Sequence, residues 1–213
     1  MQPLDHRDYL ALREGAQVLE ADGSGDKVLR LADGSMFKLF RRKRLFTSAA
    51  WYPYARRFAD NCRHLQGRSI PCPGVMAVYR IAEIERDAVH YAPLPGDTLR
   101  QLIASGNATA QLRTDLGAFL GRLHESGVYF RSVHLGNVVL TPEYRLGLID
   151  IADLRLYRRP LSRSLRLRNF RHMLRYATDR HWLTEDTDAF IQGYMASQTR
   201  CPAEAVSQAL AAL

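Results

Sequence analysis

An amide and a carboxylate flank a short apolar segment that the sequence predicts to be a β-hairpin. Asn137 stands directly before the apolar run 138–140, and Asp150 directly after the apolar run 146–149, with a turn over 142–145 between the two runs. Antiparallel pairing of the runs would bring Asn137 and Asp150 to one end of the hairpin. Amide and carboxylate oxygens suit Mg²⁺, which usually takes one or two protein ligands and completes its shell with phosphates and water. The sequence therefore predicts a site for a Mg²⁺-bound nucleotide, with Asn137 and Asp150 as metal ligands.

Two segments, Arg131-Ser-Val-His-Leu-Gly-Asn137 and Ile149-Asp150-Ile-Ala-Asp153, carry a resemblance to a known superfamily. The first resembles the catalytic loop of the protein-kinase-like superfamily, especially its small-molecule and sugar kinases, and the second is similar to the metal-binding aspartate segment of those enzymes. A third segment, Arg168-Asn-Phe-Arg-His-Met-Leu-Arg-Tyr176, is similar to the basic helix of lipopolysaccharide core (Kdo and heptose) kinases and their toluene-tolerance relatives.

The resemblance implies an α+β, bilobal protein-kinase-like fold. It implies a small antiparallel N-lobe over residues 1–92, with five strands and one helix, and a mainly helical C-lobe over residues 93–213. Five stretches are strand-like, namely 16–20, 27–31, 35–40, 75–80 and 88–91. Helical spacing of apolar residues predicts helices at 99–104, 109–126, 184–197 and 203–213, and another around Phe58.

Lys38 is the predicted contact for the nucleotide phosphates. It lies between Phe37 and Leu39 in a strand-like stretch, and the order hairpin, strand lysine, helix matches the N-lobe of kinases, in which this lysine grips the α- and β-phosphates. The alternative is a lysine on an edge strand that points into solvent. The turn with Gly23 and Gly25 either lies over the phosphates or is an ordinary turn.

The remaining nucleotide contacts follow from the resemblance to sugar and aminoglycoside kinases. Residues 92–99 form a proline-containing break that resembles the hinge of those enzymes. Backbone groups of Tyr91 and Ala92 would there pair with adenine.

The predicted catalytic loop departs from its relatives at one position. Arg131 occupies the slot of the kinase arginine, and His134 matches the second histidine of the aminoglycoside-kinase pattern, but Ser132 stands where the relatives have the catalytic aspartate. His134 could act as the base instead, because the unperturbed pKa of histidine suits neutral pH. The helix after Lys38 also lacks the glutamate that kinases pair with this lysine, and its sole acid is Asp60.

The chain is basic, with a formal charge of +8, and of its 30 basic residues only Lys27, Lys38 and Lys43 are lysines. Arginine binds phosphate and carboxylate in a bidentate way, so this composition favours anionic partners, although GC-rich codon usage also produces arginine-rich chains. Arg168, Arg171 and Arg175 follow each other at helical steps and predict a basic stripe opposite a core face of Leu167, Phe170, Met173, Leu174 and Ala177. The run 41–44 is a second candidate contact for an anionic acceptor or membrane.

Three function classes remain open. The resemblance implies an ATP- and Mg²⁺-dependent kinase that acts on a sugar hydroxyl of an anionic glycolipid or phosphorylated sugar, and the alternative is a pseudokinase that binds nucleotide or an acidic partner. A nucleic-acid-binding role is disfavoured, since no aromatic platform interleaves with the basic residues. Three cysteines without metal-like spacing, a polar start and no long apolar run predict a cytoplasmic protein, peripheral at most at the inner membrane face.

Overall fold

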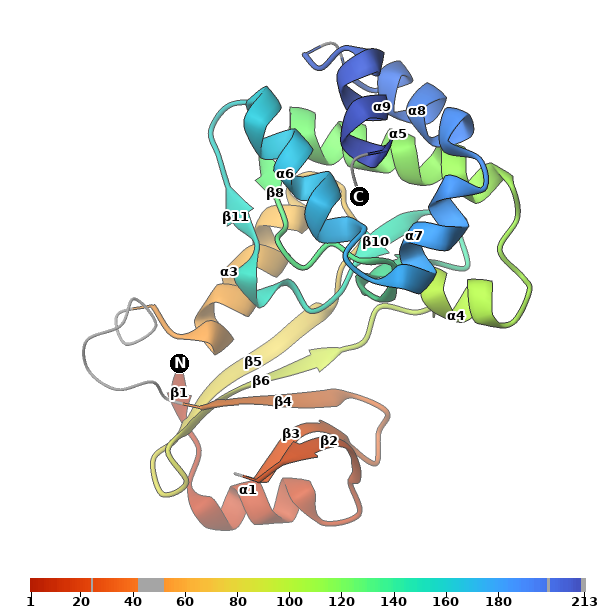
Figure 1. Ribbon diagram of the computed structural model, residues 1–213. Helices are drawn as coiled ribbons and strands as arrows, with labels where there is room; N and C mark the ends of the chain where they lie inside the picture. The colour runs from red at the N-terminus through yellow and green to blue at the C-terminus, as the bar shows by residue number, and fades with distance from the viewer. Residues whose placement is uncertain (24, 42–51, 199, 212–213) are drawn as a thin grey trace. The chain divides into compact units, whose positions relative to one another are not determined.

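The structure is a computed structural model that describes residues 1–23, 25–41, 52–198 and 200–211 (Figure 1). Its contacts divide the chain into two compact units, Met1–Leu94 and Pro95–Leu213. The boundary predicted from the sequence lies after residue 92. The basic run at 41–44 lies outside the described residues except for Arg41.

A six-stranded sheet forms the first unit, with the order β1-β5-β6-β4-β3-β2 in the described residues. The strands are β1 (Gln2–Pro3), β2 (Gln17–Asp22), β3 (Gly25–Arg30), β4 (Met36–Arg41), β5 (Gly74–Ile81) and β6 (Arg86–Ala92). All neighbours are antiparallel except β1, which pairs with β5 in parallel. The expectation of five strands is therefore one short, because a strand of two residues shows no alternation that sequence could reveal.

Within the described part of the first unit, two helices pack on the sheet, where one was expected. Helix α1 (His6–Arg13) places Tyr9 in a buried cluster with Phe37 and Leu39 of β4. Helix α3 (Tyr54–Gln66) packs against β4, β5 and β6, and its Tyr54 ring stacks on Phe40 with centroids 6.2 Å apart. Because side chains alternate along a strand, Lys38 shares the α3 side of β4 with Phe40.

The second unit is mainly helical, as expected. Its helices are α4 (Leu99–Ala104), α5 (Gln111–Glu125), α6 (Arg163–Met173), α7 (Ala177–Thr184), α8 (Thr187–Ala196) and α9 (Ala203–Ala211). The short strands are β7 (Asp97–Thr98), β9 (Val138–Leu140) and β10 (Leu146–Leu148) in one sheet, and β8 (Val128–Tyr129) and β11 (Arg155–Leu156) in another. The mixed α+β class with an N-terminal sheet and a helical C-terminal part is confirmed.

Helices α5 and α8 form the centre of the helical unit. Gly117 faces the carbonyl oxygen of Phe190 and Gly193 faces that of Thr114, so closely that a Cβ atom at either glycine would clash. Glycine at these positions lets the two helix backbones touch. Among the described residues, no helix is both long and apolar enough to cross a membrane.

Two helix predictions in the second unit need correction. The basic segment was expected to continue as a helix to Ala177, but α6 ends at Met173, and Ala177 is exposed at the start of α7. Leu167, expected in the core, is only half-buried. The helix expected over 184–197 is α8, which begins at Thr187, because Asp186 caps it by accepting a hydrogen bond from the Ala189 backbone N–H at 3.0 Å.

Candidate functional site

The predicted catalytic loop lies in the second unit, between β8 and β9. Three backbone hydrogen bonds fold it, from Val133 N to Phe130 O (3.2 Å), from His134 N to Ser132 O (2.9 Å) and from Asn137 N to His134 O (2.8 Å). The loop ends in the 3₁₀ turn η1 (Leu135–Asn137), which leads directly into β9. Its conformation is thus held by its own backbone.

The structure brings Asn137 and Asp150 together at one end of the β9–β10 hairpin. The two strands pair in antiparallel register, with Val138 opposite Leu148. The backbone N–H of Ile149 donates to the Asn137 carbonyl oxygen at 3.0 Å, so the next residue, Asp150, lies beside Asn137. The local geometry predicted from the two apolar runs is therefore present.

The donor set of this pair fits Mg²⁺. The Asn137 side chain donates through Nδ2 to the carbonyl oxygen of Ser132 at 2.9 Å, which leaves Oδ1 as the atom that can face a cation. Asp150 is exposed and adopts a left-handed backbone conformation with φ 52° and ψ 45°, an uncommon conformation for a residue other than glycine. One amide oxygen and one carboxylate are a typical protein share of a Mg²⁺ shell. The metal-ligand role of both residues stays a prediction.

Ser132 does not stand alone at the position of the missing aspartate. Its hydroxyl donates to Oδ2 of Asp153 at 2.7 Å, and both residues are half-buried. Asp153 ends the 3₁₀ turn η2 (Ile151–Asp153), which follows Asp150. In the sequence, Asp153 is recognisable only as part of a motif, and no spacing rule links it to Ser132.

His134 and Arg131 flank Ser132 in the loop. The His134 ring packs edge-on against Tyr176, with ring centroids 5.0 Å apart, and Arg131 is exposed. Burial lowers the pKa of His134, and the charge of Arg100 lowers it further. His134 is accordingly neutral near pH 7. Its catalytic role, like that of Arg131, stays a prediction.

Asp179 is hydrogen-bonded to the catalytic loop, a contact that was not predicted from the sequence. Its side chain is buried and accepts two hydrogen bonds from Arg100, Nε to Oδ1 at 3.0 Å and Nη2 to Oδ2 at 2.7 Å. Oδ2 also accepts from the backbone N–H of Leu135 in the loop at 2.9 Å. The available signal was compositional, because Asp179 is the sole acid among nine arginines in residues 155–180.

A buried network supports the other end of the loop. Asn169 donates through Nδ2 to the Phe130 carbonyl oxygen at 2.7 Å, so its Oδ1 faces Nε2 of His124 at 3.0 Å. That nitrogen must therefore donate, which leaves Nδ1 to accept from the Tyr194 hydroxyl at 2.9 Å. Burial lowers the pKa of His124 to about 4, which is consistent with a neutral ring.

Unpaired polar atoms gather around this loop. Four buried side-chain atoms lack a hydrogen-bond partner within the part of the chain that the structure describes: Tyr129 Oη, His134 Nδ1, Asp153 Oδ1 and His172 Nε2. The rings of Tyr129 and His172 lie 6.4 Å apart, centroid to centroid. Because buried polar groups in proteins are nearly always bonded, this loop is where a ligand or ordered water would find partners.

Lys38, the predicted phosphate contact, lies on an interior strand of the first unit. Strand β4 is bonded to β3 on one side and to β6 on the other, with Lys38 opposite Val28 and Val89. The lysine is half-buried, and its Nζ lies 5.8 Å from the centre of the Phe40 ring. The alternative of an edge-strand lysine is wrong, and the phosphate role stays a prediction.

The acid of helix α3 is bonded to residues other than those of the kinase pattern. Asp60 accepts from the Tyr52 hydroxyl at 2.8 Å and from Arg63 at 2.9 Å, and it lies 3.5 Å from Arg56. A tyrosine and two arginines thus already use this carboxylate.

The glycine turn and the end of β6 are the other predicted nucleotide contacts in the first unit. Gly23 and Gly25 lie in the β2–β3 turn, where a Cβ atom would meet open space, and the φ of Gly25 is 106°. Tyr91 packs against Phe58 with centroids 5.1 Å apart, and Ala92 is exposed at the last position of β6. The nucleotide contacts of these four residues stay predictions.

The two acids beside the glycine turn each lie near a basic side chain of the first unit. Asp26 pairs with Arg13 at 2.5 Å, and Asp22 lies 3.5 Å from Lys27. Lys27 also lies 3.0 Å from Glu20, so two basic side chains face three acids and one negative charge remains beside the turn.

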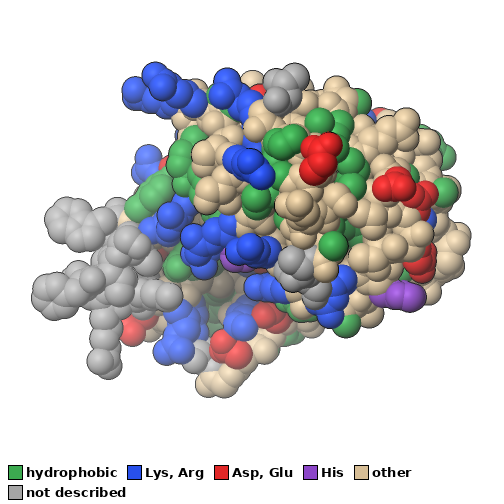
Figure 2. All heavy atoms as spheres, turned by 45° about the horizontal axis from the view of Figure 1, so that its top comes forward, with side chains coloured by type: hydrophobic (Ala, Val, Ile, Leu, Met, Phe, Trp, Pro, Cys, Tyr) green, Lys and Arg blue, Asp and Glu red, His purple; other side chains and the backbone are tan. Residues whose placement is uncertain are grey.

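A basic hollow of about 700 Å³ runs along the exposed side of α6. Its lining residues follow two rows of the helix at steps of four: Arg163, Ser164, Leu167, Arg168, Arg171 and His172. The space-filling view shows basic side chains close together on one side of the visible face (Figure 2). Arg168 and Arg171 of the predicted stripe belong to this hollow, whereas Arg175 lies beyond the end of α6 and donates to the Tyr176 hydroxyl at 2.9 Å.

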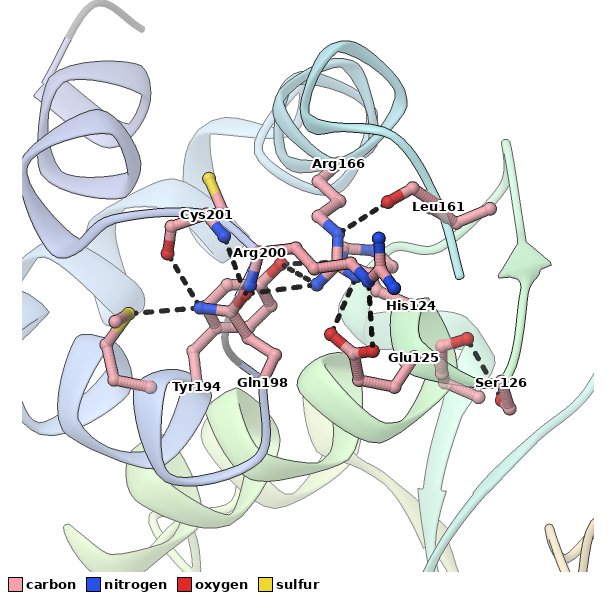
Figure 3. Close-up of polar contacts among 11 residues, drawn as sticks. His124, Glu125, Ser126, Leu161, Arg166, Tyr194, Gln198, Arg200 and Cys201 are labelled. Atoms are coloured by element: carbon pink, nitrogen blue, oxygen red, sulfur yellow. Dashed lines mark hydrogen bonds and ion pairs between the residues drawn. The ribbon is translucent and has the colours of Figure 1, made fainter. Parts of the chain in front are cut away.

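A fully buried arginine anchors α6. Arg166 donates to the Leu161 carbonyl oxygen at 2.9 Å, to the Tyr194 hydroxyl and Gln198 Oε1 at 3.2 Å each, and to Glu125 at 2.8 Å (Figure 3). These bonds join α6 to α5 and to the end of α8, which fixes the direction of the opposite, arginine-rich side. The sequence does not distinguish Arg166 from the exposed arginines, because all are of one residue type.

Comparison with known proteins gives one family. The model of the APH group, described as the phosphotransferase enzyme family, matches residues 15–131, which is more than half of the chain. The match ends at Arg131, directly before Ser132. Among curated proteins, none matches the chain.

Solved structures of one protein are similar at low identity. The bifunctional kinase-methyltransferase WbdD shares 18% identity over 61% of this chain and 30% of its own, with a TM-score of 0.43. A co-crystal structure of WbdD with the kinase inhibitor LY294002 and a 2.2 Å structure of WbdD each share 18% identity over 62% of this chain, with a TM-score of 0.40. The chain thus spans less than a third of the length of WbdD.

Proposed function

The chain belongs to the phosphotransferase enzyme family, and from this premise we propose that it transfers the γ-phosphoryl group of ATP, with Mg²⁺, to a sugar hydroxyl of an anionic glycolipid such as a lipopolysaccharide core. In this proposal Lys38 contacts the phosphates, with Gly23 and Gly25 above them. Asn137 and Asp150 hold Mg²⁺, which would neutralise charge on the phosphates. The backbone at Tyr91 and Ala92 contacts adenine.

The observation that supports an anionic acceptor is the hydrogen bond between the basic helix α6 and the catalytic loop. Asn169 of α6 donates to the Phe130 carbonyl oxygen at 2.7 Å, one residue before Arg131. Arg168 and Arg171 lie on the same helix and line the basic hollow. An acceptor whose phosphates or carboxylates bind these arginines would have its sugar hydroxyls near the loop, since guanidinium groups hold such anions in bidentate geometry.

A glycolipid acceptor also determines where the protein would work. We place it in the cytoplasm and at the inner face of the membrane, where basic side chains add attraction to anionic lipid. A phosphorylated sugar in solution would present the same chemistry to the arginines.

A pseudokinase is the second candidate, and two observations favour it. Ser132 replaces the expected catalytic aspartate, and the only described acid of α3, Asp60, is bonded to Tyr52, Arg56 and Arg63. Such a protein would bind nucleotide or an acidic partner without transferring phosphate.

Transfer of labelled phosphate from [γ-³²P]ATP tests the proposal. We expect label in lipopolysaccharide core and little label in the same glycolipid after its phosphates are removed. Arg168→Gln with Arg171→Gln should lower the transfer by about tenfold or more, because charged hydrogen bonds contribute roughly 1.5–3 kcal/mol each. Arg155→Gln with Arg158→Gln removes equal charge from exposed positions of the same unit and is the matched control.

The outcomes separate the candidates. Binding of Mg·ATP without label in any glycolipid would support the pseudokinase. Equal loss in both double variants would assign the effect to overall charge and overturn the role of α6. Label in the neutral glycolipid at the same rate would overturn the anionic acceptor.

A further inference from the structure

The loop position that lacks an aspartate has a carboxylate beside it. Ser132 Oγ donates to Asp153 Oδ2 at 2.7 Å, although 21 residues separate them in sequence. A short hydrogen bond from a hydroxyl to a carboxylate prepares the transfer of the hydroxyl proton to that carboxylate. Such a transfer can accompany the arrival of a second proton on the hydroxyl oxygen.

Strand pairing explains why these two residues meet. β8 and β11 are antiparallel, with Tyr129 opposite Arg155. Continuing this register past the strands brings the segment after Tyr129 alongside the segment before Arg155, which contains Asp153. The contact is therefore a consequence of the fold and not of a mobile side chain.

Hydrogen bonds within the catalytic loop also restrain the backbone of Ser132. The Ser132 carbonyl oxygen accepts from Asn137 Nδ2 at 2.9 Å and from the His134 backbone N–H at 2.9 Å. Two donors on one carbonyl restrain the serine backbone and so restrain where its hydroxyl lies. Ser132 thus stands next to a predicted metal ligand, where an acceptor hydroxyl would have to approach.

Asp153 has capacity to take up a proton. Its Oδ2 is used by Ser132, while Oδ1 is buried and, within the described residues, has no hydrogen-bond partner. A buried carboxylate oxygen without a partner is rare in proteins, and a catalytic role is one of the explanations for such an atom.

We propose that Ser132 and Asp153 together replace the missing aspartate as the proton acceptor of phosphoryl transfer. This inference rests on the proposed function. The acceptor hydroxyl gives its proton to Ser132 Oγ, while the Ser132 proton passes to Asp153 Oδ2. The acceptor oxygen forms its bond to the γ-phosphorus, and the bond from that phosphorus to the bridging oxygen breaks, with the electron pair leaving on ADP. Asp153 later releases the proton to water.

His134 is less suited to this role. Its ring lies against Tyr176, and its Nδ1 faces Gly136, where a Cβ atom would lie 3.1 Å from both that nitrogen and Arg100 Nη1. No hydrogen bond joins His134 to the Ser132 hydroxyl among the described residues, and the hydroxyl donates to Asp153 instead. Ser132 therefore contacts the acceptor, and Asp153 acts through it.

The test compares Ser132→Ala, Asp153→Asn and the double variant, with ATP hydrolysis and phosphate transfer as readouts. We expect each single variant to lower kcat by roughly 10²- to 10⁴-fold. Groups that act as a unit are not additive, so the double variant should lose no more than either single variant. The Kd for Mg·ATP should stay close to that of the parent, and Asp188→Asn, an exposed acid, is the control.

A swap variant gives a readout that a structural role would not produce. Ser132→Asp alone places two carboxylates side by side, which disfavours the charge on one of them. Ser132→Asp with Asp153→Ser moves the single carboxylate into the loop. The kcat of the swap variant should therefore be at least tenfold higher than the kcat of Asp153→Asn.

Failure of this inference differs from failure of the proposed function. A parent that turns over ATP while Asp153→Asn is unaffected, or while His134→Gln alone abolishes turnover, overturns the role of Asp153 and leaves the phosphotransferase. A parent that binds Mg·ATP but turns it over only after the swap overturns both the Ser132–Asp153 proton acceptor and the enzyme in favour of the pseudokinase. A parent that neither binds nor hydrolyses Mg·ATP overturns the proposed function itself.

Discussion

Individual buried polar residues hold the site in the helical unit. His124, Asn169 and Tyr194 form a chain of hydrogen bonds that ends on the Phe130 carbonyl oxygen, at the start of the catalytic loop. Arg166 adds a positive charge to this chain by donating to the Tyr194 hydroxyl at 3.2 Å. A neutral His124 fits this chain, since its Nδ1 then accepts from the Tyr194 hydroxyl, which itself accepts from Arg166.

The pH dependence of stability should report the charge state of His124. Burial lowers its pKa to about 4 in the folded protein, whereas an unfolded histidine titrates near 6.5. Between these values the unfolded state binds the extra proton, so the free energy of unfolding falls as the pH falls from 7 to 4. The loss is about 3 kcal/mol for this shift. Urea unfolding of the parent and His124→Gln at several pH values measures it.

The comparison isolates one histidine. Burial also lowers the pKa of His134 and of His172, but both residues remain in the variant. The parent should therefore lose about 3 kcal/mol more than His124→Gln between pH 7 and pH 4. The exposed His181→Gln serves as the control and should follow the parent. Parallel curves for parent and His124→Gln would contradict the buried, neutral ring.

Sequence reasoning located loop residues better than buried polar ones. Asn137 and Asp150 were placed together because a hairpin is a local structure with a readable pattern. Arg166 and Asp179 were not singled out, because burial of a charged side chain depends on partners that are distant in sequence. The bond from Ser132 to Asp153 was missed for the same reason.

Asp179 connects two helices and the catalytic loop. It belongs to α7, pairs with Arg100 of α4 and accepts from Leu135 in the loop. Arg100 in turn lies 4.6 Å from the centre of the Tyr176 ring, which contacts His134. One carboxylate therefore sets the positions of two helices relative to the loop.

Replacing Asp179 should weaken both the fold and the loop. Asp179→Asn removes the charge and at least one bond to Arg100, and a buried group that loses such a partner costs about 1–3 kcal/mol. Arg100 remains partly in water, so the larger values for fully buried ion pairs do not apply. Thermal unfolding should show the loss, and kcat should fall in addition. Asp188→Asn should change neither quantity, and an Asp179→Asn variant as stable and active as the parent would contradict the role.

Elements with local signals were predicted well. The helix expected at 99–104 is α4, and Thr98 caps it together with Gln101 in a reciprocal capping box. The helix expected over 109–126 is α5, followed by Gly127 with a φ of 74°. The end of α6 was wrong because its basic and apolar periodicity continues past Met173, while the chain turns there toward α7.

At the scale of the whole molecule, the proposed nucleotide contacts are divided between the two units. Lys38 lies in the unit Met1–Leu94, whereas Asn137 and Asp150 lie in the unit Pro95–Leu213. Each set has a local structural reason for its place, an interior strand for the lysine and the end of a hairpin for the other two. If one Mg·ATP uses both sets, substitutions in either unit should weaken its binding.

Mg·ATP should raise the melting temperature of the parent by several degrees. A ligand that binds only the folded state stabilises it by about 2.7 kcal/mol at a hundredfold excess over Kd. Asp150→Ala should remove the part of the shift that needs Mg²⁺, and Asn137→Ala should do so more weakly, because a neutral amide oxygen attracts the ion less than a carboxylate does. Lys38→Ala should reduce the shift with or without the metal, because the ammonium group would meet phosphate directly.

The pattern across these variants matters more than any single shift. If one nucleotide contacts both units, variants in either unit must reduce the same shift, and Lys38→Ala combined with Asp150→Ala should leave almost none. Arg7→Ala is the control for charge in the first unit, since Arg7 is exposed on α1 and is not assigned to phosphate. A shift that depends on Asp150 but not on Lys38 would confine the ligand to the helical unit. A parent that shows no shift at saturating ATP and Mg²⁺ would contradict nucleotide binding, and with it the phosphotransferase, before any acceptor needs to be tested.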